Sequence, residues 1–67
     1  MSGLDPSDIK RGDVLRYHPV IGLPEYIRVR VMHEPWELGS GDWICKAQGI
    51  NDGKIYRPSV DALAREP

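Results

Sequence analysis

The chain has 67 residues, of which 28% are charged and 40% hydrophobic, with a formal net charge of −1 and one cysteine. This length allows one domain, residues 1–67, and excludes a large enzyme core, while the charge excludes a protein that coats nucleic acid by bulk electrostatics. A lone cysteine excludes an internal disulfide, and the lack of a long apolar run or an apolar leader predicts a cytoplasmic protein that does not enter a membrane. We expect residues 1–8 and 64–67 to be flexible.

The first predicted element is a single helical turn after Asp5. An aspartate side chain can accept a hydrogen bond at the start of a helix, and Pro6 suits the next position because it has no N–H to leave unpaired. Gly12 ends this segment, and we expect Ile9 to fold back into the core. The first strand is then predicted over residues 13–18.

The clearest pattern is a strict alternation over residues 26–32, which follows a loop marked by prolines and glycine. Ile27, Val29 and Val31 occupy one face. The other face carries Tyr26, Arg28, Arg30 and Met32. This pattern predicts a strand of an antiparallel sheet that is buried on one side and wetted on the other.

A second loop is predicted over residues 33–41 because it contains one proline and two glycines. The third strand follows at residues 42–48. Its parity is less regular than that of the second strand. We expect Trp43, Cys45 and Ala47 to face the core, and Ile44, Lys46 and Gln48 to face outward.

Turn residues precede a fourth strand, predicted over residues 54–57. Pro58 ends this strand, Ser59 can cap a second helical turn, and Leu63 closes the core. Four to five short antiparallel strands with short helical turns predict an all-β fold, specifically a small SH3-like barrel. The alternative is an open antiparallel sheet that a partner chain completes.

Two parts of the chain resemble known families. Residues 12–16, Gly-Asp-Val-Leu-Arg, resemble the opening of many SH3-like barrels. Residues 53–56 and 60–63 resemble the end of the plasmid-encoded type II dihydrofolate reductases, which implies a tetramer of barrels around a central pore that binds folate and NADPH. A Val-Gln-Ile-Tyr stretch lines that pore in the family. Lys54 stands at the glutamine position, and an ammonium cannot accept a hydrogen bond as an amide does.

The outward face of the predicted sheet supplies the candidate binding residues. Interleaved Arg, Lys and Tyr can pair with phosphates and stack on bases, and Arg and Tyr also dominate protein interfaces. The same pattern is typical of a solvated face covered by long side-chain stems. Trp36 is either a binding anchor, which could form a peptide groove with Tyr17 and Tyr56, or a lid over one barrel end. The candidate binding residues are Tyr26, Arg28, Arg30, Trp36, Lys46, Lys54 and Tyr56.

We find no complete catalytic signature in the sequence. His18, His33 and Cys45 lie on separate predicted elements without metal-ligand spacing, so we expect neither a metal nor a cofactor. Cys45 is expected to be a buried, unreactive side chain. The sequence therefore predicts a non-catalytic binding module that acts on a protein partner or on a second copy of itself. The alternatives are a nucleic-acid-binding barrel and an oligomeric NADPH-dependent reductase.

Overall fold

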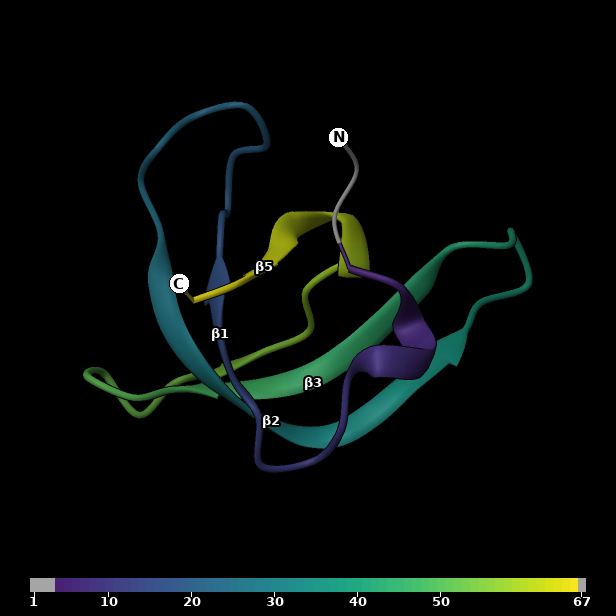
Figure 1. Ribbon diagram of the computed structural model, residues 1–67, viewed down its shortest axis with the longest axis horizontal. Coiled ribbons are helices and arrows are strands. Elements are labelled where there is room, and N and C mark those ends of the chain that lie inside the picture. The colour runs from purple at the N-terminus through teal and green to yellow at the C-terminus, as the bar shows by residue number, and fades with distance from the viewer. Residues whose placement is uncertain (1–3, 67) are drawn as a thin grey trace.

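Five antiparallel strands form one sheet in the computed structural model, which describes residues 4–66 (Figure 1). The strands are β1 (Val14–Tyr17), β2 (Ile27–Glu37), β3 (Trp43–Gly49), β4 (Ile55–Tyr56) and β5 (Leu63–Arg65), in the sheet order β4-β3-β2-β1-β5. Two 3-10 turns, η1 (Pro6–Asp8) and η2 (Val60–Ala62), are the only helical elements in the described range. The predicted all-β fold of antiparallel strands with short helical turns is confirmed, and the sheet is not closed.

The alternation predicted for β2 sets the two faces of the sheet. Val29 lies opposite Leu15 of β1, and Val31 lies opposite Ala47 of β3. Residues that pair directly in a sheet point to the same side, and all four of these side chains are buried. The arginines that alternate with the two valines are exposed. The predicted division of β2 into a core face and a wetted face is therefore confirmed.

The core is one cluster on the inner face of this sheet. Its buried members are Ile9, Leu15, Val29, Val31, Cys45, Ala47, Val60 and Leu63. The sheet curls around the cluster, because the rings of Tyr17 on β1 and Tyr56 on β4 have centroids 5.4 Å apart although β2 and β3 lie between those strands. A β-bridge between Ile44 and Ser59 holds the approach to η2 against β3. The molecule is thus a strongly curled sheet with β4 and β5 as its edges.

Both 3-10 turns begin at the predicted capping residues. Asp5 Oδ1 accepts a hydrogen bond from the backbone N–H of Ser7 at 3.0 Å, and Ser59 Oγ accepts one from the N–H of Asp61 at 3.3 Å. Each cap satisfies a donor that the first turn of a helix leaves unpaired. Ile9 follows η1 directly and is 2% exposed, so its predicted return to the core is confirmed.

The loop predicted over residues 33–41 is wrong for residues 33–37, because β2 continues to Glu37, and residues 38–41 lie in the connection to β3. Two register shifts, one on either side of His33, interrupt the pairing of β2 with β3. A proline has no N–H to give to a strand ladder, and sheets accommodate it at such irregular positions. Pro35 therefore marks an irregular stretch of a continuing strand rather than the end of that strand.

Two further expectations differ from the structure. Trp43 has the inward parity that was predicted, yet it is 38% exposed because it is the first residue of β3 and lies beyond the core cluster. Residues 1–8 were expected to be flexible, but Pro6–Asp8 form η1. Residues 1–3 and 67 lie outside the described range.

Residues 64–67 are predicted to be flexible; of these, Ala64 and Arg65 lie in the last strand, β5. β5 pairs with β1 and places Leu63 in the core. Arg65 Nη1 lies 3.3 Å from a carboxylate oxygen of Asp13, and Arg65 Nη2 donates to the backbone carbonyl of Asp8. This end of the chain is thereby joined to the segment around η1.

Replacing Val29 with aspartate tests the assignment of the two faces. Val29 has no exposed surface, so the new carboxylate would be buried without a partner and should lower the free energy of unfolding by roughly 3 kcal/mol or more. Arg30→Asp is the matched control, since it places the same carboxylate on the exposed face. Urea unfolding followed by circular dichroism measures both, and equal stability of the two variants would contradict the assignment.

A glycine at position 49 is required by space rather than by backbone conformation. A Cβ there would collide with the carboxylate of Asp52 and lie 3.2 Å from the Tyr56 ring. Gly49→Ala should therefore cost about 1–3 kcal/mol of stability through overpacking. Gly39→Ala is the control, because a Cβ at that position would have nothing within 4 Å of it. Thermal unfolding should separate the two variants, and a native midpoint for Gly49→Ala would reject the argument.

Candidate binding surface

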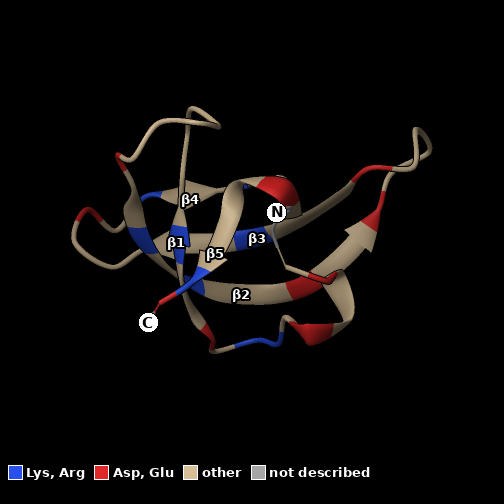
Figure 2. Cartoon of the chain, turned by 45° about the horizontal axis from the view of Figure 1, so that its top comes forward, with Lys and Arg blue, Asp and Glu red and all other residues tan. Residues whose placement is uncertain are grey.

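Within the strands most charged residues are basic, whereas most acidic residues lie in turns, loops and the ends of the chain (Figure 2). Among the acidic residues, all of which fall within residues 4–66, only Glu34 and Glu37 lie in a strand. The outward positions of β1, β2 and β3 carry arginine and lysine, and a further arginine follows β4. We define the basic face as Arg16, Arg28, Arg30, Lys46 and Arg57. Although the net charge of the chain is −1, the basic face carries a local excess of positive charge.

Two arginines of the basic face lie directly opposite each other, Arg16 on β1 and Arg28 on β2. Like charges in such positions repel each other unless they are compensated. Arg28 Nε and Nη2 donate to the two carboxylate oxygens of Glu66 at 2.6 and 3.1 Å. The Arg16 guanidinium lies 4.6 Å from the centroid of the Tyr26 ring, a cation–π distance. Both arginines, and Tyr26 with them, thus have partners within the chain.

The ion pair shifts the pKa values of both partners. Hydrogen bonding and charge from Arg28 lower the pKa of the Glu66 carboxyl, and Glu66 raises the pKa of the Arg28 guanidinium. The two side chains remain 47% and 27% exposed, so solvent screens the attraction and its effect on stability is small. The pair nevertheless shows that an arginine on this face can bind a carboxylate through two parallel hydrogen bonds, as a bidentate pair.

A hollow of about 350 Å³ on the outer face brings cations and aromatic rings together. Its lining residues are His33, Trp36, Lys46 and Arg57, and we call it the outer hollow. The imidazole and indole rings meet edge to face at 90°, with centroids 5.4 Å apart. His33 Nδ1 lies 2.6 Å from the carbonyl oxygen of Glu34, and since a carbonyl can only accept, Nδ1 carries a proton. This bond orients the His33 ring.

The irregular pairing of β2 with β3 builds the outer hollow. His33 pairs with Lys46, and Trp36 pairs with Ile44. The intervening Cys45 is buried on the inner face, so its two neighbours on β3 and their partners on β2 have outward parity. A continuous strand therefore holds Trp36 in place, where the sequence predicted a loop.

Five of the seven predicted binding residues lie on the outer face: Tyr26, Arg28, Arg30, Trp36 and Lys46. Tyr56 was expected there, but its ring packs against Tyr17 on the inner side and its hydroxyl donates to the Asp52 carboxylate at 2.5 Å. Lys54 lies in the turn before β4, where its N–H donates to Asp52 at 2.9 Å. The predicted groove of Tyr17, Trp36 and Tyr56 does not form, because Trp36 lies on the opposite face.

Three members of this surface were missed from the sequence. Arg16 could have been found, because it alternates with Leu15 in a strand that was predicted. His33 was missed because it was placed in a loop. Arg57 was missed because the predicted parity put Tyr56 outward, whereas the pairing of Tyr56 with the buried Ala47 turns Tyr56 inward and gives the next residue, Arg57, outward parity beside Lys46.

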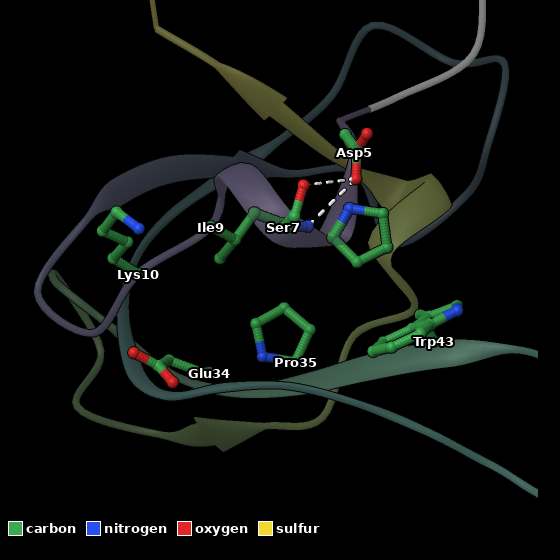
Figure 3. A pocket seen from close by; sticks show the side chains of 8 residues that line it. Asp5, Ser7, Ile9, Lys10, Glu34, Pro35 and Trp43 are labelled. Carbon is green, nitrogen blue, oxygen red and sulfur yellow. Dashed lines mark hydrogen bonds between the residues drawn. The ribbon is translucent and has the colours of Figure 1, made fainter.

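A second hollow, of about 410 Å³, lies between η1 and the β2–β3 hairpin (Figure 3). Its apolar wall is formed by Pro6, Ile9, Pro35 and Trp43, and we call it the η1 hollow. Lys10 and Glu34 lie toward the end away from the indole ring. The exposed face of Trp43 is thereby part of a concave surface whose other lining residues include Asp5, Ser7, Lys10 and Glu34.

Cys45 lies in the core, and burial raises the pKa of its thiol to about 11. At neutral pH the thiol is therefore protonated and poorly nucleophilic. Across residues 4–66, no three His, Cys, Asp or Glu side chains gather closely enough to hold a metal ion. The same part of the chain contains no helix with the length and apolar character needed to cross a membrane.

No protein-family model, no curated protein and no solved structure matches this chain. The resemblances to SH3-like barrels and to the type II reductases therefore stay predictions. The function has to be argued from the surface itself.

The Arg28–Glu66 pair predicts a specific titration. Because the folded pKa of Glu66 is lowered, the pair's contribution to stability is present above the ordinary glutamate pKa and is lost as the pH falls through the folded value. Arg28→Gln should raise the Glu66 pKa toward the ordinary range, measured by carbon-13 NMR of the side-chain carboxyl. Arg30→Gln is the control, and an unchanged Glu66 titration in Arg28→Gln would show that the pair does not form in solution.

Proposed function

We propose that this chain is a non-catalytic binding module that takes a short acidic segment of a partner protein on its basic face. The observation that carries the proposal is the outer hollow, which the rings of Trp36 and His33 line together with the cationic side chains of Lys46 and Arg57. Aromatic and arginine side chains supply most of the energy in protein interfaces. A segment that carries carboxylates next to an apolar or aromatic residue would match this lining.

The contact between Arg28 and Glu66 supports carboxylate as the recognised group. It is a two-pronged pair made by the chain's own acidic residue on the same face. Arg30 and Lys46 have no ion-pair partner among residues 4–66, so their charge is available to a ligand. An acidic segment on the basic face can therefore pair with Arg30 of β2 and with Lys46 of β3.

The distribution of acidic residues favours a short segment over a nucleic-acid strand. Glu25 and Glu66 lie near one end of the outer face, and Glu37 and Asp42 lie where the β2–β3 hairpin turns. A phosphate backbone that runs beyond the basic face would meet these carboxylates and be repelled. Nucleic acid remains the second candidate because Trp36 and His33 could stack on bases beside the two cations.

Charge reversal in the outer hollow tests the proposal. The probe is a fluorescein-labelled peptide of Asp, Glu and Tyr, and fluorescence anisotropy measures its dissociation constant. Lys46→Glu combined with Arg57→Glu should weaken binding by at least about tenfold, because two attractive charges become repulsive. Lys10→Glu combined with Lys54→Glu is the control, because both residues are exposed outside the outer hollow and the net charge changes by the same amount; this variant should bind within about threefold of the native protein.

The same titration with a thymidine oligonucleotide of similar length separates the two candidates. Preference for the oligonucleotide, with affinity that falls steeply as salt rises, would replace the protein ligand by nucleic acid. Equal loss of peptide binding in the control variant would show that net charge alone, rather than the outer hollow, attracts the peptide. Either result would overturn the proposal.

A further inference from the structure

We propose that this protein associates head to tail with copies of itself, through insertion of the β1–β2 loop of one copy into the η1 hollow of the next. The function proposed above uses neither this loop, residues 19–24, nor the η1 hollow. The inference is independent of that function, because neither feature belongs to the basic face.

The β1–β2 loop presents three large aliphatic side chains to solvent. Val20, Ile21 and Leu23 are 58%, 66% and 51% exposed, and Ile21 is the most exposed large hydrophobic residue in the described range. Their concentration in one short loop distinguishes them from scattered surface residues and marks a contact site. The sequence singled out this segment only as a loop, because its prolines and glycine dominate the pattern.

The loop is held in one shape by its own hydrogen bonds. The N–H of Leu23 donates to the carbonyl of Val20 at 3.2 Å, and His18 Nδ1 lies 3.2 Å from the carbonyl oxygen of Leu23. Gly22 has φ +95°, a conformation that other residues rarely adopt, which allows the chain to reverse there. A loop that is ordered before it binds loses little conformational entropy on binding.

The η1 hollow offers a concave surface that is partly apolar. The rings of Pro6, Pro35 and Trp43 supply its apolar part, and Asp5, Ser7, Lys10 and Glu34 supply its polar part (Figure 3). Its volume of about 410 Å³ is within the range of sites that enclose small apolar groups. The aliphatic tip of the loop therefore fits the hollow better than it fits the charged outer face.

The positions of the two features determine the kind of assembly. The loop and η1 lie at different ends of the molecule in both views (Figures 1 and 2), so one copy cannot fill its own hollow. A symmetric contact between two loops would leave the η1 hollow of each copy empty. A loop-in-hollow contact is heterologous, so each added copy leaves a free loop and a free hollow.

The experiment measures mass by light scattering and sedimentation over a range of protein concentrations. The native protein should form species larger than a dimer as concentration rises. Ile21→Asp damages the loop and Trp43→Ala damages the hollow, and each change alone should weaken association at least about tenfold. An equimolar mixture of the two variants should form a one-to-one complex, because the first retains an intact hollow and the second an intact loop.

Two further variants keep the test independent of folding defects. Ser7→Trp fills the hollow from an exposed position on η1 and should act like Trp43→Ala. Ile50→Asp introduces the same charge as Ile21→Asp at another exposed isoleucine and should leave association unchanged. Circular dichroism checks that every variant keeps the native fold.

Three results would each overturn the inference. The first is a native protein that stays monomeric at about 1 mM, where even a contact with a millimolar dissociation constant would be half formed. The second is loss of association in Ile21→Asp that no hollow variant reproduces, which would indicate contact between loops. The third is failure of the two damaged variants to combine when they are mixed.

Discussion

The two-residue period of β2 is the constraint on which the rest of this structure depends. It places Val29 opposite Leu15 and Val31 opposite Ala47. All four side chains belong to the single hydrophobic core cluster of this short chain. The same period directs the arginines of β2 to the opposite side. The core and the basic face are therefore two consequences of one pattern, and a change of register by one residue would exchange them.

The curl of the sheet adds what alternation alone does not provide. Contact between Tyr17 and Tyr56 brings β1 and β4 together around the core, and the hydroxyl of Tyr56 is bonded to Asp52 in the preceding turn. Gly49 leaves the space that this turn requires. The pairing of Ala47 with Tyr56 continues toward Lys46 and Arg57, so the register of β3 with β4 brings these two cations together in the outer hollow.

Local chemistry was sufficient to predict some parts of the molecule. The faces of β2, the caps at Asp5 and Ser59 and the return of Ile9 follow from period and hydrogen-bonding capacity within a few residues. The continuation of β2 through Pro35 depends on pairing with β3, which the sequence does not show. The inward position of Tyr56 depends on its register with Ala47 of β3, which the sequence does not show either. The arginines of β2 were therefore predicted, but His33 and Arg57, which complete the outer hollow, were not.

Burial of the one thiol gives this protein a built-in reporter of its own motions. Cys45 has no exposed surface, and a pKa of about 11 keeps the thiol protonated at neutral pH, so a thiol reagent reaches it only when β3 separates from the core. The rate at which a thiol reagent modifies Cys45 therefore reports how often the native protein opens at β3. No label has to be introduced for this measurement. A ligand bound to the outer face, or a second copy bound at the η1 hollow, would slow the modification of Cys45.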